Sequence, residues 1–201
     1  MNCRVCNFES SPVFKALILG KNQVQYFKCN NCGYLFTEEP YWLNEAYSSA
    51  INISDTGLMG RNTYYSKVVS VLTYFLFNKN GKFVDYAGGY GIFTRLMRDV
   101  GLDFYWQDLH CENLLSRGFE YQSGVHKNIE LLTAFEVFEH LVNPIEEIKK
   151  MVDISGNIIF STLILPSPIP EPKDWWYYGF EHGQHISFYS LKTLNFIGEI
   201  F

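Results

Sequence analysis

One stretch of the sequence decides the fold: Lys82-Phe83-Val84-Asp85-Tyr86-Ala87-Gly88-Gly89-Tyr90-Gly91. Residues 82–86 have the composition of a short buried strand, and the residues from Ile92 to Val100 predict a helix. The glycines between them permit a tight turn and let a ligand approach where a Cβ atom would block it. A strand that ends in an acid and leads through such a turn into a helix is typical of a nucleotide-binding site.

The spacing of these glycines separates the known kinds of nucleotide site. A dinucleotide site requires Gly-x-Gly-x-x-Gly, but counting from Gly89 the third glycine position holds Thr94. A P-loop is excluded because no Gly-Lys-Ser/Thr follows. An ordinary strand-to-helix turn without a ligand remains as the alternative.

Strands and helices alternate outward from this turn. The expected strands lie at residues 103–107, 119–122, 130–135 and 156–163, and the expected helices at 112–116, 144–153 and 191–201, the last capped by Ser190. Before the turn, one apolar face with helical spacing predicts a helix from Arg61 that packs on the core; its members are Tyr64, Val68, Val71, Leu72 and Phe75. This alternation predicts an α/β fold, a doubly wound parallel sheet with helices on both faces.

The turn resembles the first motif of class I S-adenosylmethionine-dependent methyltransferases, acid-x-Gly-x-Gly-x-Gly. Asp85, Gly89 and Gly91 are in register with it, and Ala87 replaces the first glycine. Asp108 ends the next strand, where a carboxylate accepts both ribose hydroxyls, as in dinucleotide folds. The residues expected to bind the cofactor are Asp85, Ala87, Gly88, Gly89, Gly91, Asp108 and Glu136.

A second segment, Glu136-Val137-Phe138-Glu139-His140, also resembles this family, in which the fourth strand ends in an acid followed by a Glu-His pair. The resemblance covers roughly residues 80–190 and implies a Rossmann-like sheet. Such a sheet would need two more strands than the sequence supplies. We therefore expect the C-terminal strands to be missing, either in a shortened version of the fold or through loss of the tail.

Two interpretations of Glu139 and His140 stay open. In one, they hold the following loop and the sheet edge, while backbone near Glu136 meets the methionine part of the cofactor. In the other, Glu136, Glu139 and His140 join a later histidine in an oxygen/nitrogen site for a divalent metal such as Mg²⁺. Glu-x-x-Glu-His resembles the metal-using O-methyltransferases of quinone biosynthesis and the small-RNA 2′-O-methyltransferases.

A proline-rich and aromatic loop at residues 166–190 follows the last clear strand. Ligands of open α/β sheets lie beyond the carboxyl ends of the strands, which is where this loop begins. It offers His185, and then His182, as catalytic general bases near neutral pH. The alternative is that His185 binds the backbone ahead of Ser190 and that the rings belong to the core.

Two Cys-x-x-Cys pairs near the N-terminus have the spacing of a zinc ribbon. Four thiolates from Cys3, Cys6, Cys29 and Cys32 would form a closed tetrahedral site, so the expected zinc is structural. Disulfides are the alternative, and the lack of a secretion signal disfavours them. A zinc module before a methyltransferase domain resembles the sugar C-methyltransferases of deoxysugar biosynthesis, although Gln184 stands where that family has Glu and the chain is about half as long.

Composition limits the partners. The chain has 201 residues and a net charge of −5, without a cluster of Lys and Arg, which argues against nucleic acid and anionic membranes. No apolar stretch is long enough to span a bilayer, and the N-terminus does not resemble a signal peptide, so we expect a cytoplasmic protein. The sequence leaves the oligomeric state open.

These observations predict a zinc-ribbon module at residues 1–40, a connector with one short helix at 41–60 and an S-adenosylmethionine-binding methyltransferase domain at 61–201. The expected function is methyl transfer to a small molecule, with a nucleotide-linked sugar as one candidate acceptor. Two alternatives remain: a divalent-metal-assisted O-methyltransferase, and a non-catalytic zinc-ribbon scaffold on a degenerate methyltransferase fold. The expected cofactors are S-adenosylmethionine and structural zinc, with Mg²⁺ as a further candidate.

Overall fold

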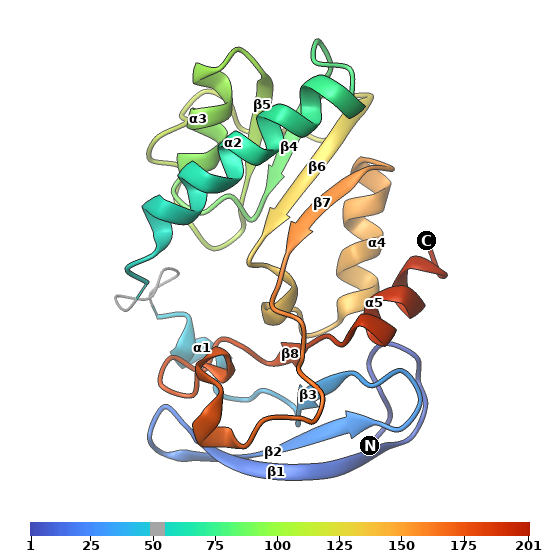
Figure 1. Ribbon diagram of the computed structural model, residues 1–201. Helices are drawn as coiled ribbons and strands as arrows, with labels where there is room; N and C mark the ends of the chain where they lie inside the picture. The colour runs from blue at the N-terminus through green and yellow to red at the C-terminus, as the bar shows by residue number, and fades with distance from the viewer. Residues whose placement is uncertain (49–54) are drawn as a thin grey trace. The chain divides into compact units, whose positions relative to one another are not determined.

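The structure, a computed structural model, describes residues 1–48 and 55–201 (Figure 1). The described chain forms two compact units. The first comprises residues 1–48, 136–149 and 161–201, and the second comprises residues 55–135 and 150–160. Part of the predicted connector, residues 49–54, lies outside the described residues. The predicted domain boundaries near residues 40 and 60 stay a prediction.

The second unit is built on a sheet of four strands in the order β5-β4-β6-β7. The strands span Asp103–Gln107 (β5), Lys82–Tyr86 (β4), Ile129–Phe135 (β6) and Ile158–Ser161 (β7). β4 pairs in parallel with both β5 and β6, which confirms the predicted α/β fold with a parallel sheet. Because the chain runs outward from β4 to β5 and then returns to β6 on the other side, the sheet reverses its order between β4 and β6. Open α/β sheets bind ligands at such a point.

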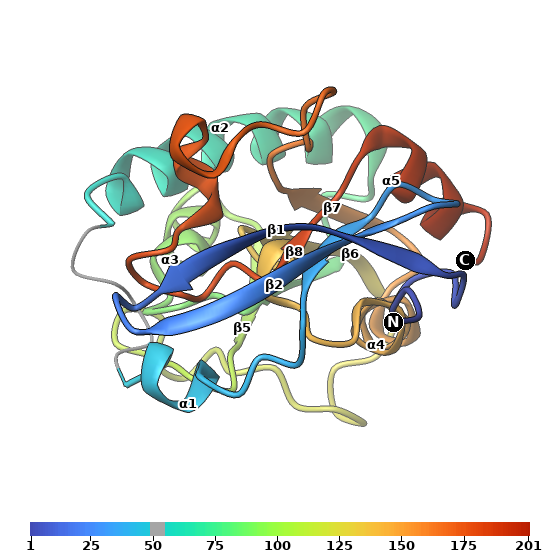
Figure 2. The ribbon, with the colours of Figure 1, turned by 90° about the horizontal axis from the view of Figure 1, so that it is seen from below.

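Helices cover both faces of this sheet. α2 (Leu58–Leu76) and α3 (Ile92–Asp99) pack against each other on one face, and the last residues of α4 (Pro144–Ile154) lie on the opposite face (Figures 1 and 2). The core under α2 and α3 consists of buried apolar side chains, namely Val69, Phe83, Phe93, Met97, Leu102, Phe104 and Leu131. Burial of these side chains fixes both helices on the sheet.

The predicted core face of α2 was wrong. The helix forms as expected, but Tyr64 is 64% exposed and Phe75 is 82% exposed, while Val69 and Thr73 are buried against the sheet. The reason is that α2 has apolar residues on both sides, so helical spacing alone identifies an apolar stripe without showing which stripe meets the core.

Between Gln107 and β6 the structure differs from two further predictions. Residues 112–116 form no helix, because the Asn113 side chain accepts the Ser116 N–H at 2.8 Å and donates to the Ser116 carbonyl at 2.8 Å. Such local bonds compete with a helix. The strand expected at 119–122 is reduced to one parallel bridge between Trp106 and Glu120.

The first unit contains an antiparallel sheet in the order β1-β2-β3-β8. Its strands are β1 (Ser10–Ile18), β2 (Asn22–Cys29), β3 (Leu35–Thr37) and β8 (Ser187–Phe188). β8 pairs with β3 and so joins the far end of the chain to the N-terminal strands. The remaining elements of this unit are the helix α1 (Leu43–Ala46), the 3-10 turns η1 (Phe138–His140), η2 (Pro172–Asp174) and η3 (Trp176–Tyr178), and the helix α5 (Leu191–Gly198).

The Ser190 cap was predicted and is present. The Ser190 hydroxyl accepts the Thr193 N–H at 3.1 Å, and Thr193 completes a capping box. Within the part of the chain that the structure describes, no helix combines the length and the hydropathy needed to cross a bilayer.

Gly91 and Gly101 form a matched pair for testing the turn. Both have a left-handed backbone, with φ of +83° and +85°. A Cβ on Gly91 would lie 2.5 Å from Ser116 Oγ and 2.8 Å from Asn113 Oδ1, whereas nothing lies within 4 Å of one on Gly101. We expect Gly101→Ala to cost about 1–2 kcal/mol of unfolding free energy, and Gly91→Ala about 1–3 kcal/mol more because of the contact. Urea denaturation measures both, and equal losses would contradict this account.

Candidate functional site

The glycine turn after β4 has an unusual backbone. Ala87, Gly89 and Gly91 all adopt positive φ, at 55°, 55° and 83°. For alanine this conformation costs roughly 1–2 kcal/mol, a strain that proteins retain mainly at functional sites. Ala87 is exposed and Gly89 is partly exposed, whereas Gly91 is buried. The first part of the turn is therefore open to a ligand. Gly91 is the buried N-cap residue of α3.

Asp85 lies inside the second unit. Its carboxylate accepts the Thr94 hydroxyl of α3 at 2.9 Å and the Thr133 hydroxyl of β6 at 3.2 Å. Burial raises the pKa of this carboxyl to about 7. The side chain thus ties β4 to its neighbouring strand and to the following helix. We conclude that Asp85 positions the turn from below.

Asp108 follows β5 and binds the turn directly. One carboxylate oxygen accepts the Gly89 N–H at 2.9 Å, and the other accepts the N–H groups of His110 at 2.7 Å and Cys111 at 2.9 Å. The Trp106 indole donates to the Gly89 carbonyl at 2.9 Å, so Gly89 is held from both sides. A carboxylate has about four acceptor positions, and three are used here. Asp108 therefore retains capacity to accept a ligand hydroxyl beside the open part of the turn.

The loop after Asp108 covers the end of the turn. The N–H of Leu115 donates to the Tyr90 carbonyl at 3.0 Å, and the Ser116 hydroxyl donates to the Gly91 carbonyl at 2.6 Å. Neither Asn113 nor Ser116 was predicted to be a site residue. The Asn-x-x-Ser spacing of a side-chain-capped turn was the signal available in the sequence.

In the first unit, Glu136 is the residue that directly follows β6 in the chain. It has a φ of 54°, a second non-glycine residue in the left-handed region after a central strand. Its N–H donates to the Ser161 hydroxyl at 2.9 Å, and that hydroxyl donates to the Glu136 carboxylate at 2.6 Å. Ser161 thereby fixes both the backbone and the side chain of Glu136.

Glu139 is fully buried in the same unit. One carboxylate oxygen accepts the Tyr177 hydroxyl at 2.6 Å, and the other, Oε2, has no hydrogen-bond partner among the described residues. Burial, together with the charge of Glu136, raises the pKa of Glu139 to about 8. A buried oxygen without a partner is costly and calls for a proton, a ligand or a metal ion.

Three imidazoles lie near one another in this unit, and two of them, those of His140 and His185, lie close to Glu139. The ring of His185 lies 4.9 Å from that of His140 and 4.7 Å from that of His182, measured between centroids. Burial lowers the pKa of all three, to about 4 for His140, and the neighbouring rings lower those of His140 and His185 further. The three rings are therefore neutral near pH 7 and able to act as ligands or proton acceptors.

Hydrogen bonds assign the protons on these rings. The Nδ1 atom of His185 lies 2.6 Å from the Tyr177 carbonyl, which can only accept, so Nδ1 carries the proton and Nε2 carries the lone pair. The Nδ1 atom of His182 accepts the Gln184 N–H at 3.1 Å, which leaves its proton on Nε2. His140 binds the Tyr47 hydroxyl at 2.9 Å and the backbone of Gln184. His185 is thus the ring with a proton-accepting nitrogen left over.

These side chains also satisfy the spacing of a metal site. Glu139, His140 and His185 each offer a ligand atom, and the three atoms lie within 4.8 Å of one another. The structure brings Glu139, His140 and a later histidine together, as the metal interpretation of the sequence requires. Glu136 is not part of this group, because its carboxylate is held by Ser161.

A comparison with protein families decides the class of the protein. A family model described as a methyltransferase domain matches residues 60–199, well over half of the chain. The chain belongs to this methyltransferase family. No curated protein gave a significant match to it.

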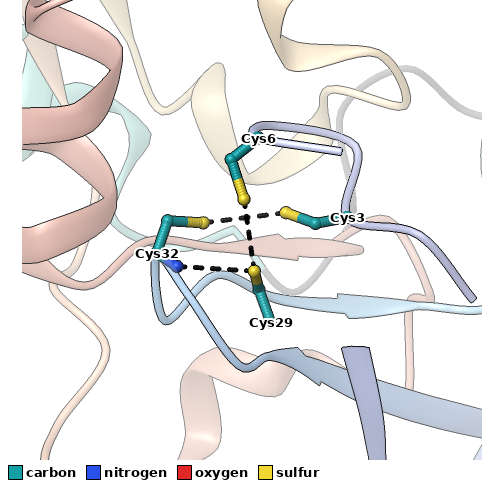
Figure 3. Close-up of side chains that lie close together, drawn as sticks. All are labelled: Cys3, Cys6, Cys29 and Cys32. Carbon is teal, nitrogen blue, oxygen red and sulfur yellow. Dashed lines mark hydrogen bonds between the residues drawn. The ribbon is translucent and has the colours of Figure 1, made fainter. Parts of the chain in front are cut away.

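The methyltransferase carries four cysteines ahead of the matched segment (Figure 3). The sulfur atoms of Cys3 and Cys32 lie 3.6 Å apart, and those of Cys6 and Cys29 lie 3.3 Å apart. All four are free thiols, so the disulfide alternative is wrong. Four bonds of about 2.3 Å in a tetrahedron place sulfur atoms about 3.8 Å apart. Since all four sulfur atoms lie within 4.8 Å of one another, the cluster could hold a metal ion.

The predicted site residues of the methyltransferase fall into two groups. Six of the predicted cofactor residues lie in the second unit, namely Asp85, Ala87, Gly88, Gly89, Gly91 and Asp108. Glu136, His182 and His185 lie in the first unit. Sequence reasoning missed Tyr177, whose hydroxyl binds Glu139 and whose carbonyl binds His185. The aromatic run at residues 175–178 was the only hint, because it marked the loop without distinguishing Tyr177 from its neighbours.

Proposed function

We propose that this protein is an S-adenosylmethionine-dependent methyltransferase that acts on a small molecule, with a nucleotide-linked sugar as the leading acceptor class. One observation carries the proposal: the strained, exposed turn after β4 is hydrogen-bonded, through Gly89, to the carboxylate of Asp108 after β5. A backbone open to close approach and an acceptor for ribose hydroxyls are thereby held next to each other.

The roles of the cofactor residues follow from their environments. Ala87, Gly88 and Gly89 present backbone to the nucleoside, and Asp108 accepts a ribose hydroxyl at its remaining acceptor position. Asp85 and Gly91 act indirectly, because one is buried beneath the turn and the other beneath Ser116. Backbone near Glu136 is proposed to meet the methionine part of the cofactor.

Methyl transfer needs alignment and a proton acceptor. Bound S-adenosylmethionine would supply a methyl group made electrophilic by its sulfonium. The lone pair or carbanion of the acceptor would bond to the methyl carbon in line with the breaking C–S bond, and the sulfur would leave as a neutral thioether. We assign proton removal to Nε2 of His185. The Tyr177 carbonyl fixes its tautomer, and burial keeps the ring neutral. The Nε2 atom of His182 carries a proton, because its Nδ1 accepts the Gln184 N–H. His182 is therefore assigned as a hydrogen-bond donor that supports the loop, and not as the base.

The cysteine module and the segment around His185 point to the acceptor class. The chain combines a cysteine module with Gln184-His185, a pattern similar to that of the sugar C-methyltransferases. The net charge of −5 disfavours a nucleic-acid acceptor. We therefore propose a small activated acceptor and no nucleic-acid partner.

A second candidate is metal-assisted O-methylation. The unpartnered Glu139 Oε2 and the two nearby imidazoles favour it, since a divalent cation would satisfy that oxygen and could lower the pKa of an acceptor hydroxyl. Against it, His140 already binds both Tyr47 and the Gln184 backbone, so a cation would have to displace one of these bonds. For this reason His185 as a base is the preferred mechanism.

We also propose that the four-cysteine cluster holds structural zinc. The thiol sulfurs receive backbone N–H bonds at 3.4 Å from Val5 to Cys3 and from Asn31 and Cys32 to Cys29. Such bonds stabilise thiolate charge at a metal. A closed set of four sulfur ligands leaves no position for a substrate.

Calorimetry with S-adenosylmethionine tests the cofactor assignment. Asp108→Ala should weaken binding about tenfold or more, because the ribose loses a charge-assisted hydrogen bond. Asp99→Ala, which removes an exposed carboxylate paired with Arg95, is the control and should bind like the wild type. Thermal melts show whether loss of the three backbone bonds has unfolded the variant. A wild-type protein that binds no S-adenosylmethionine would end the proposal.

His185→Gln and Glu139→Gln distinguish the base from the metal. If His185 is the base, its variant should lose about 10²–10⁴-fold in turnover while keeping its affinity for S-adenosylmethionine, and neither wild type nor Glu139→Gln should bind Mn²⁺ at this cluster. Electron paramagnetic resonance of added Mn²⁺ gives a readout independent of activity. Tight Mn²⁺ binding that Glu139→Gln abolishes would favour the metal mechanism instead.

Metal analysis tests the cysteine cluster. The purified protein should contain about one zinc per chain, and Cys29→Ser should lower both zinc content and thermal stability because a closed site needs all four thiolates. Cys111→Ser removes a thiol outside the cluster and should change neither. Full stability and turnover in a preparation free of zinc would contradict a structural role.

A further inference from the structure

The outward side of α2 carries a row of exposed apolar side chains, which we call the α2 stripe: Tyr64, Val68, Val71 and Phe75. Their exposed fractions are 64%, 36%, 57% and 82%. The helix uses its other side for the core, where Val69 and Thr73 are buried and Tyr65 stacks on Phe135 with 4.3 Å between centroids. The α2 stripe is therefore additional to the apolar surface that folds the second unit.

The spacing of the α2 stripe is that of a helix-pairing seam. Its members follow one another at intervals of four, three and four residues, which are the a and d positions of a heptad. Such a seam keeps one face of a helix in contact with a partner helix over about three turns. An ordinary surface helix shows polar residues at these positions.

The size of the surface suits a stable contact. Three more apolar side chains of α2 are more than half exposed, namely Met59, Tyr74 and Leu76. Of these three, only Tyr74 borders the α2 stripe and extends it, since Met59 and Leu76 project from other sides of the helix. Contiguous exposed apolar patches of a few hundred Å² mark interaction sites. A standard protein interface buries about 800 Å² on each partner, so the α2 stripe would form the centre of such an interface.

The α2 stripe reads almost the same in both directions, with rings at its ends and valines at its centre. We propose that it is the interface of a homodimer, in which two copies of α2 pack antiparallel about a two-fold axis. Val68 would then lie against Val71 of the partner subunit, and Tyr64 against Phe75 of the partner subunit. Two-fold symmetry requires such reciprocal contacts, and the small central residues let the helices approach closely.

The charges of α2 permit two copies to pack against each other. The helix contains Arg61 and no acid, with Lys67 beside the α2 stripe, and the Arg61 charge is already paired with Asp55 at 2.6 Å. Lys67 flanks the seam, so pairing of two copies buries no charge at its centre. A basic apolar helix would also suit an anionic lipid surface, but the net charge of −5 opposes this.

Sedimentation equilibrium of the full chain tests the proposal. The wild type should run as a dimer of the 23.4 kDa chain at micromolar concentration. Val71→Glu should shift it to a monomer, with a dissociation constant at least a hundredfold weaker. The control is Leu109→Glu, an 81% exposed apolar position of the same unit outside the α2 stripe, which should remain dimeric. Circular dichroism melts verify that each variant is folded.

A double variant tests the orientation. Val68→Glu with Val71→Lys creates two Glu–Lys contacts across an antiparallel pair, so it should recover dimerisation that Val68→Glu alone has lost. A wild type that stays monomeric at 100 µM would overturn the proposal. It would also be overturned if Val71→Glu leaves the dimer intact, or if the protein is a monomer that floats with phosphatidylserine vesicles and loses this binding on Val71→Glu.

Discussion

The buried carboxylate of Asp85 is the interaction on which the parallel sheet and its turn depend. It joins β4 to β6 through Thr133 and to α3 through Thr94. It also explains Gly88, where a Cβ would lie 2.6 Å from the carboxylate and 2.8 Å from Trp106. Burying this group is expensive, as its pKa near 7 shows, and the two hydroxyl donors offset part of that cost. The backbone above it is consequently held in one conformation.

That rigidity supports strain where the chain leaves the sheet. Ala87 and Glu136 follow adjacent parallel strands, and both have a left-handed backbone that non-glycine residues seldom adopt. The bonds of Asp108 to Gly89 and of Ser161 to Glu136 stabilise this conformation locally. Pre-formed backbone of this kind binds a ligand without first having to be ordered. The family match identifies a methyltransferase domain over residues 60–199, which contain both strained positions.

Much of the fold could be predicted because its signals are local. The strand at Lys82–Tyr86 was predicted to the residue, and the Ser190 cap has a short-range chemical cause. The face of α2 could not be predicted, because two apolar stripes compete and only the sheet selects one. The role of Tyr177 could not be predicted either, since its partners Glu139 and His185 lie on separate segments.

The sequence by itself determined the alternation of strands and helices, the glycine turn with its downstream acid, and the two cysteine pairs, because each depends on neighbours along the chain. Only the tertiary structure decided which acids are buried and which histidine keeps a free nitrogen. It also decided that β8 completes the N-terminal sheet. Burial and proton position depend on groups brought together from distant segments, so no local pattern records them. The same holds for α2, whose apolar stripe was visible in the sequence but whose exposure was not.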